Sequence, residues 1–160
     1  MLAEFLASAP VGVLELRCVE ISHSSFGAPL RLVHDYQPVV VTLENGAQAI
    51  FSACAFRTGR PSVDESGRIT RSLQIDAVDG AITRALLDAS QSDEPILCTF
   101  RVYLNTDLSG PQFDPPEVLS LTSISINKTS ITASAENEDV INKRFPNSIY
   151  LFRTDDCFDL

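Results

Sequence analysis

The chain carries few residues of the types that usually perform catalysis. His23 and His34 are its only histidines, and Asp35 adjoins His34. A Cys–His or Ser–His–Asp arrangement would use such residues for nucleophilic catalysis. The sequence has no nucleophile elbow or other catalytic signature around them, and adjacent residues on a strand point to opposite faces. We therefore expect a protein that is not an enzyme; a deep pocket that joins His23 or His34 to a thiol or a carboxylate would favour an enzyme instead.

Possible metal ligands are also spaced unlike known metal sites. The four cysteines are scattered, without a C-x-x-C pair: Cys18, Cys54, Cys98 and Cys157. This spacing disfavours zinc, and the aspartates form no D-x-D-x-D-G calcium loop. Cys18 and Cys98 stand in strand-like runs, where a buried free thiol is the simplest interpretation. We expect no cofactor and no metal.

Length and charge describe one acidic globular domain, residues 1–160. Apolar residues make up 44% of the chain, and 12 basic against 21 acidic residues give a net charge of −9. Such a balance disfavours a groove that grips nucleic-acid phosphates. No run reaches the ~20 apolar residues of a membrane helix, and no basic region precedes the small residues at 7–9. We expect cytoplasmic synthesis and no membrane partner.

Residues 71–104 carry the clearest structural pattern, which is strand, acidic turn, helix and strand. Polar and apolar residues alternate over 72–75, and Asp79 can cap a following helix. Its apolar stripe falls at helical spacing: Ile82, Ala85, Leu86 and Ala89. From Ile96 to Leu104 the period returns to two. A helix this short must pack on the sheet.

The remaining segments predict further strands and short terminal helices. Residues 11–22 are apolar on both strand faces, which indicates a central or covered strand. Asn45-Gly46 predicts a hairpin between 39–43 and 47–51. We expect a short strand at 30–33, a hairpin of 118–126 with 130–135, helical segments at 2–8 and 136–143, and a strand at 149–152. The predicted class is α+β, with mainly antiparallel, barrel-like β-sheets and one helix on the sheet.

These patterns also predict which side chains are largely buried, namely Leu86, Phe100, Val102, Leu121 and Ile124. By contrast, residues 57–69 hold two glycines, a proline and, before the final Ile69, one aliphatic residue, Val63, which predicts an exposed, mobile loop. Four arginines gather around this loop: Arg57, Arg60, Arg68 and Arg71. We expect them to form an interface that becomes ordered against an acidic surface of a neighbouring chain.

An ordered series of short motifs runs through nearly the whole chain. Its most specific parts are EISHSSF (20–26) with PLRLV (29–33), and NKRFP (142–146) with Ile149-Tyr150. Between them stand LQIDAVD (73–79), FRVYL (100–104) and the loop motifs at 109–112 and 114–116. The series resembles a family of uncharacterised tail-module proteins of long, flexible-tailed bacteriophages. The order strand, acidic turn, helix, strand also resembles the N-terminal hub region of the lambda-type tail-tip protein L.

This resemblance implies a structural role and supplies no catalytic residues. Hub proteins of this kind form a trimeric, β-rich ring that joins the tail tube and distal tail proteins to the central fibre or spike. The implied location is the virion tail, assembled in the host cytoplasm. Protein L carries a C-terminal iron–sulfur cluster. Here Cys157 is the only cysteine near the C-terminus, so the cluster is not carried over.

A ring of this kind should let DNA pass without specific binding, because lumenal carboxylates repel phosphates. The candidate lumenal residues are Asp93, Glu94, Glu136, Glu138 and Asp139. A monomer with evenly spread acidic residues remains an alternative. The main rival function is a small-ligand or carbohydrate-binding β-sandwich module. A pocket lined by aromatic residues would favour it, although the chain has no Trp and only three Tyr.

Overall fold

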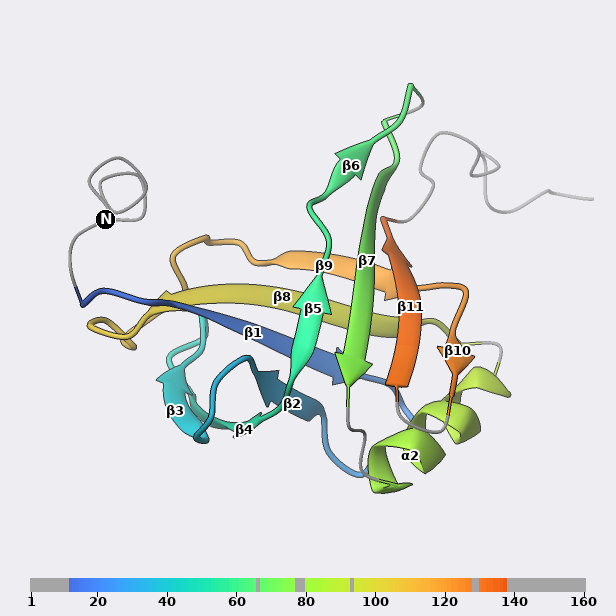
Figure 1. Ribbon diagram of the computed structural model, residues 1–160, viewed down its shortest axis with the longest axis horizontal. Coiled ribbons are helices and arrows are strands. Elements are labelled where there is room, and N and C mark those ends of the chain that lie inside the picture. The colour runs from blue at the N-terminus through green and yellow to red at the C-terminus, as the bar shows by residue number, and fades with distance from the viewer. Residues whose placement is uncertain (1–11, 66, 77–79, 93, 128–129, 138–160) are drawn as a thin grey trace, which may run out of the picture.

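The computed structural model describes residues 12–137, apart from 66, 77–79, 93 and 128–129 (Figure 1). The described part is mostly β-sheet, with a single short helix. Its elements are β1 (Glu15–Ser22), β2 (Leu30–Val33), β3 (Val39–Thr42), β4 (Gln48–Ala53), β5 (Phe56–Thr58), β6 (Ser62–Val63), β7 (Ile69–Asp76), α2 (Gly80–Ser90), β8 (Ile96–Leu104), β9 (Glu117–Leu121), β10 (Ser125–Ile126) and β11 (Ser130–Glu136).

Two long antiparallel strands form the centre of the sheet. β1 and β8 pair along their whole length, from Glu15 opposite Leu104 to Ser22 opposite Leu97. β2 lies on the outer side of β1, and β9 lies on the outer side of β8. Side chains on both faces of β1 are buried. This confirms the prediction that the strand is central, because apolar residues on both faces require a cover on each side.

The sheet continues from β9 into a second group of strands that crosses the first. The strand order is β3-β4-β2-β1-β8-β9-β11-β7-β5, with β6 and β10 paired at its side. In Figure 1, β5, β7 and β11 run across β1, β8 and β9. β2 and β4 pair in parallel, so the sheet is mixed. The predicted barrel-like closure is wrong, because the path ends at β3 and β5, which do not pair with each other.

Two hydrophobic clusters lie on opposite faces of the β1–β8 pair. The larger one fills the space between the crossing strand groups and includes Val19, Phe100 and Leu73. α2 lies near the ends of β7 and β11 and adds Leu86 and Ala89 to this cluster. The stripe predicted for the helix is thus confirmed. A smaller cluster lies under the β3–β4 hairpin, where the hydroxyl of the buried Tyr103 donates to the Thr42 carbonyl at 3.0 Å.

The predicted hairpins are present at both ends of the sheet. The β3–β4 hairpin turns at Asn45-Gly46, and Gly46 has a φ of 79°. That left-handed conformation favours glycine, because it lacks a Cβ. β10 and β11 form the last hairpin, and β9 pairs with β11 separately through Leu121. The helical segments at 2–8 and 136–143, the strand at 149–152 and the Asp79 cap involve residues outside the described part.

The burial prediction needs correction at three of its five positions. Leu86 and Phe100 are buried, as predicted, but Val102, Leu121 and Ile124 are only half-buried. Val102 lines a cavity beside β1, while Leu121 and Ile124 line a hollow beside the end of α2. Each position therefore keeps one side open to solvent.

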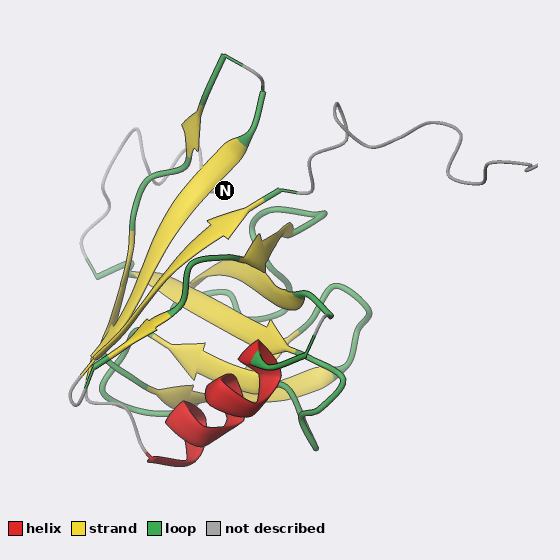
Figure 2. Ribbon diagram, turned by 90° about the vertical axis from the view of Figure 1, so that its right-hand side faces the viewer, coloured by secondary structure: helices red, strands yellow, loops and turns green. Residues whose placement is uncertain are grey.

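Residues 57–69 do not form the irregular loop expected from their composition. β5 and β6 both pair with β7, and a tight turn at 64–67 joins β6 to it. Backbone pairing along β7 needs few apolar side chains, which explains why composition alone missed it. Figure 2 shows β6 and the adjoining end of β7 projecting from the body. We call residues 57–71, which include this projection and most of β5, the arm.

Candidate functional site

The four arginines predicted as an interface all belong to the arm, but they have different surroundings. Arg57 on β5 and Arg60 after it are exposed. Arg68 is half-buried, and its Nη1 lies 3.5 Å from a carboxylate oxygen of Glu136. Arg71 on β7 is half-buried and forms an ion pair with Glu117. Two of the four charges are therefore balanced within the chain.

Beneath the arm lies a cavity of about 120 Å³ that sequence analysis did not find. Arg17, Arg60 and Arg71 line it, and they come from β1, the β5–β6 connection and β7. Phe100 and Val102 of β8 supply apolar wall. The three arginines meet only because the arm crosses over the β1–β8 pair. We call this space the arginine cavity.

Arg71 is the most firmly held of the three cavity arginines. Its Nε donates to the Gly59 carbonyl at 3.0 Å, its Nη1 binds Glu117, and its guanidinium lies 4.5 Å from the centre of the Phe100 ring. Such cation–π contacts add attraction to the ion pair. The Gly59 amide donates to the Ser72 carbonyl at 2.8 Å. A Cβ at position 59 would meet the Ser72 hydroxyl, which would have to rotate away.

The opposite face of the β1–β8 pair carries a different arginine, Arg101, whose side chain is 4% exposed. Its Nε and Nη2 donate to the two carboxylate oxygens of Glu44 at 2.9 and 2.8 Å. Nη2 also lies 3.4 Å from Glu20, which in turn pairs with Arg31. Hydrogen bonding to Arg101 lowers the pKa of Glu44. Nη1 is buried without a hydrogen-bond partner in the described part of the chain.

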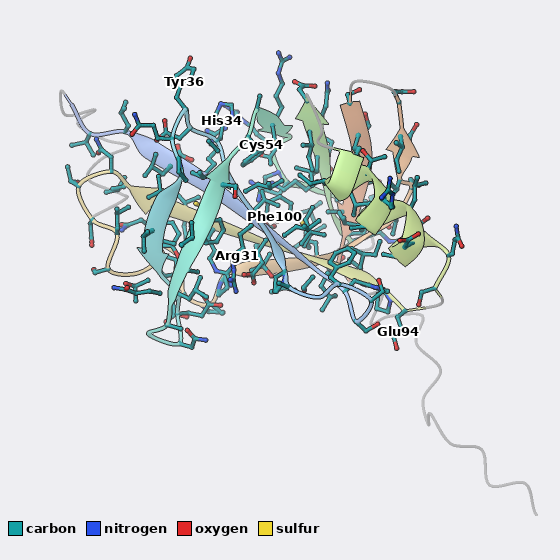
Figure 3. All side chains as sticks on the ribbon, turned by 90° about the horizontal axis from the view of Figure 1, so that it is seen from below. Arg31, His34, Tyr36, Cys54, Glu94 and Phe100 are labelled. Carbon is teal, nitrogen blue, oxygen red and sulfur yellow. The ribbon has the colours of Figure 1, made fainter. Side chains whose placement is uncertain are left out.

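A groove of about 590 Å³, larger than the arginine cavity, lies near the start of β1. It is lined by residues that include Leu14, His34, Asp35, Tyr36 and Cys54. Figure 3 shows Tyr36, His34 and Cys54 along the same side of the molecule. A histidine, a carboxylate and a thiol thus meet in one groove, which is the arrangement that could support an enzyme.

The chemistry of this groove disfavours a nucleophilic thiol. Burial, together with the charge of Asp76, raises the pKa of Cys54, whereas reactive cysteines have a lowered pKa. The Cys54 thiol donates a weak hydrogen bond to the Ala55 carbonyl at 3.8 Å. The His34 ring packs edge-on against Phe56, with ring centres 5.5 Å apart.

The other histidine, His23, belongs to a local turn after β1. Its Nδ1 accepts a hydrogen bond from the Ser25 amide at 3.1 Å and lies 2.7 Å from the Ser25 hydroxyl. Because the backbone already occupies Nδ1, this pair holds the turn and does not form a base ready to activate a nucleophile. His23 and His34 are separated by β2 and are not brought together in one hollow.

The acidic residues predicted to line a lumen are only partly described. Glu94 is exposed and accepts a hydrogen bond from the Ser24 hydroxyl. Figure 3 places it far from Tyr36. Glu136 forms the ion pair with Arg68 described above. Asp93, Glu138 and Asp139 lie outside the described residues, so their lumenal role stays a prediction.

The remaining cysteine predictions are confirmed where they can be seen. Cys18 and Cys98 are buried free thiols, and burial raises the pKa of each to about 12. Cys157 lies outside the described residues. Within the described part, no three His, Cys, Asp or Glu side chains cluster in a way that could hold a metal ion. The described helix is too short and too polar to cross a membrane.

Comparison with known proteins gives a family but no activity. No curated protein matches this chain. A family model described as "Domain of unknown function (DUF1833)" matches residues 1–150. That match covers all the strands and the helix described above. The chain therefore belongs to the DUF1833 family.

Proposed function

We propose that this protein is a structural component of a bacteriophage tail tip, a minor tail or hub protein. In this role it joins the tail tube and distal tail proteins to the central fibre or spike, as part of a homotrimeric ring in the virion. The protein is not an enzyme in this proposal. The sequence support is the ordered series of motifs, several of which fall on β1, β2, β7 and β8.

The structural observation that carries the proposal is the projecting arm. Both residues of β6 are exposed, and the Val63 side chain is 66% exposed at a position away from either core. Among the strands that the structure describes, β6 pairs only with β7. An unpaired strand edge is a template for pairing with another chain. A projection that adds little to its own core is therefore best explained by contact with a neighbour.

A second surface at the other end of the sheet supports the same role. Val40 on β3 and Ile50 on β4 stand opposite each other on the outer face of that hairpin. They are 50% and 65% exposed. β3 is also an end strand of the sheet. Subunits of a ring need two contact regions, and the arm and this hairpin provide two that are far apart in the strand order.

The charge of the chain fits a channel for DNA. The net charge of −9 gives a surface that repels phosphates. DNA carries one charge per ~1.7 Å of its axis, so a lumen rich in arginine would retain it. The arm arginines accordingly belong at subunit or partner contacts, and the carboxylates belong at the lumen.

The decisive experiment is a cryo-electron microscopy map of purified tails in which this chain is located. We expect three copies in a ring, a lumen with more acidic than basic side chains, and more than ~1,000 Å² buried at each subunit contact. Absence from the particle, or a channel with net positive charge, would refute the proposal.

The groove beside Tyr36 favours a second candidate, a small-ligand or carbohydrate-binding module. Its volume of about 590 Å³ suits a small molecule. Tyr36 is fully exposed and could stack on a sugar ring. However, it is the only Tyr, Phe or Trp among the described residues that line the groove. Saturable binding of a glycan that is lost in Tyr36→Ala and kept in Tyr103→Phe would favour this candidate over the tail role.

A further inference from the structure

The arginine cavity concentrates positive charge in a strongly acidic chain. Four arginines and one acidic residue, Glu15, line it. One of the four, Arg101, has its guanidinium bound to Glu44, and the other three are Arg17, Arg60 and Arg71. Arg17 pairs with Glu15 at 2.9 Å, and Arg71 pairs with Glu117. Arg60 forms no ion pair with any described residue. Among its lining residues, Arg60 thus carries a charge that no described carboxylate balances, whereas Arg17 and Arg71 are each paired.

We propose that the arginine cavity is a binding site for a single oxyanion, a carboxylate or phosphate group. Guanidinium groups match both groups, because their planar fork donates two parallel hydrogen bonds. A guanidinium carries five N–H donors, more than Arg17 and Arg71 use in their contacts with the described residues. The cavity therefore already contains N–H groups that can donate hydrogen bonds to an anion.

The walls of the cavity should strengthen this attraction. Phe100 is buried, Val102 is half-buried, and both form apolar wall beside the arginines. Charge interactions are stronger beside low-dielectric surfaces than in bulk water. Arg71 is also immobilised by the Phe100 ring, Glu117 and the Gly59 carbonyl. A preorganised donor loses less conformational entropy when a ligand binds.

The volume of the cavity suits one small charged group. A cavity volume of about 10–15 Å³ is enough to hold one water molecule. The arginine cavity, with about 120 Å³, therefore admits a carboxylate or phosphate group together with some water. The arm connection at Gly59, Arg60 and Pro61 forms one wall. This site does not depend on the tail role, because its chemistry is complete within one chain.

The test is a heteronuclear NMR titration in which sodium phosphate or sodium acetate replaces sodium chloride at constant ionic strength. We expect saturable shifts at Arg17, Arg60 and Arg71, and none at Arg31 on the other face. Arg60→Gln should weaken binding about tenfold, as expected when one hydrogen bond to a charged group is lost.

Arg57→Gln is the matched control, because it removes the same charge from an exposed arginine of the arm that does not line the cavity. Its effect should stay under about twofold, since salt screens an exposed charge. Equal weakening by both variants, or no saturable shift with either anion, would overturn the proposal.

A capped glutamate-rich peptide, compared with acetate at equal carboxylate concentration, identifies the source of the anion. Tighter binding of the peptide supports the site and assigns it to an acidic side chain of a protein. Tighter binding of phosphate supports the site and assigns it to a free ion. A peptide whose affinity is unchanged by Arg60→Gln binds elsewhere, and that result counts against the cavity as a protein contact.

Discussion

The two faces of the β1–β8 pair each hold arginines, but in opposite electrostatic situations. On one face, Arg101 is almost fully buried and is met by two carboxylates, Glu20 and Glu44. On the other, Arg71 lies beside Phe100 at a cavity that also holds Arg17 and Arg60. Carboxylates neutralise the arginine on one face, whereas on the other face the arginines outnumber the carboxylates that pair with them.

This difference separates a structural arginine from arginines available to a ligand. A buried charge is stable only when partners replace its water, and the hairpin turn at Glu44 supplies such a partner to Arg101. An arginine beside solvent carries no such requirement, so Arg60 can remain unpaired at little cost. We therefore expect mutations on the Glu44 side to change stability, and mutations around the arginine cavity to change mainly anion binding. Phe100 and Arg71 are exceptions, because Phe100 also belongs to the core and Arg71 also binds Glu117 and lies over the Phe100 ring.

Phe100→Ala should have the largest effect on stability. Phe100 is buried in the larger cluster and carries the Arg71 guanidinium over its ring. Its loss should lower the free energy of unfolding by about 3–5 kcal/mol through lost burial and a new cavity. Urea unfolding measures this. Phe113→Ala is the control, since that side chain is 55% exposed. Equal effects would show that the core has been assigned wrongly.

Arg101→Ala should destabilise the fold by about 2–4 kcal/mol, because it leaves Glu20 and Glu44 without their shared partner. Both carboxylates keep some exposure to water, which reduces the cost. Adding Glu44→Gln to this variant should restore part of the loss. A double variant no more stable than Arg101→Ala, measured by the same urea unfolding, would argue against a direct Arg101–Glu44 coupling.

Arg71→Ala should cost about 1–2 kcal/mol, the sum expected for a partly exposed ion pair and a cation–π contact. Arg57→Ala should change stability by less than about 0.5 kcal/mol, because an exposed side chain away from such contacts contributes little. If the two variants lose equal stability, Arg71 is no better anchored than an ordinary surface arginine. The distinction between fixed and free arginines in the arm would then fail.

Local patterns predicted the parts of the fold that depend on neighbouring residues. The helix stripe, the Asn45-Gly46 hairpin and the alternation of β8 all follow from spacing within a few residues. The burial of Leu86 and Phe100 follows from the same patterns, and both were predicted. These features need no knowledge of what lies across the sheet.

Long-range pairing decided what the sequence did not reveal. Arg101 lies on the face of β8 that carries both polar and apolar residues, so alternation does not predict its burial. The β3–β4 hairpin covers this face and buries Arg101. The arginine cavity joins Arg17, Arg60 and Arg71 through the crossing of separate strands. Pairing residues 15–22 with residues 97–104 places Cys18 opposite Arg101. Glu20 is the next residue of β1 on the same face as Cys18, so the pairing also brings Glu20 near Arg101. The signal for the Arg101 site lies in that register, which becomes visible only when the two strands are paired.

The smallest expected effect concerns the pH dependence of the Arg101–Glu44 pair. Because Arg101 holds the pKa of Glu44 below its ordinary value of 4.5, the charged carboxylate favours the folded state. Its contribution is therefore complete above the unfolded pKa and is lost as the pH falls through the lower folded pKa. Glu44 is 30% exposed, so solvent screens the interaction. We expect only about 0.2–1 kcal/mol.

The measurement compares urea unfolding of the wild type and Glu44→Gln at neutral pH and again well below 4.5, the ordinary pKa of Glu44. The stability difference between the two proteins should shrink on acidification, because the protonated carboxyl then resembles the amide. Glu65→Gln, an exposed residue of the arm, controls for the general loss of negative charge. A difference that grows at low pH, or that Glu65→Gln reproduces, would mean that Arg101 is not balanced by Glu44. The contrast between the two faces would then rest on burial alone.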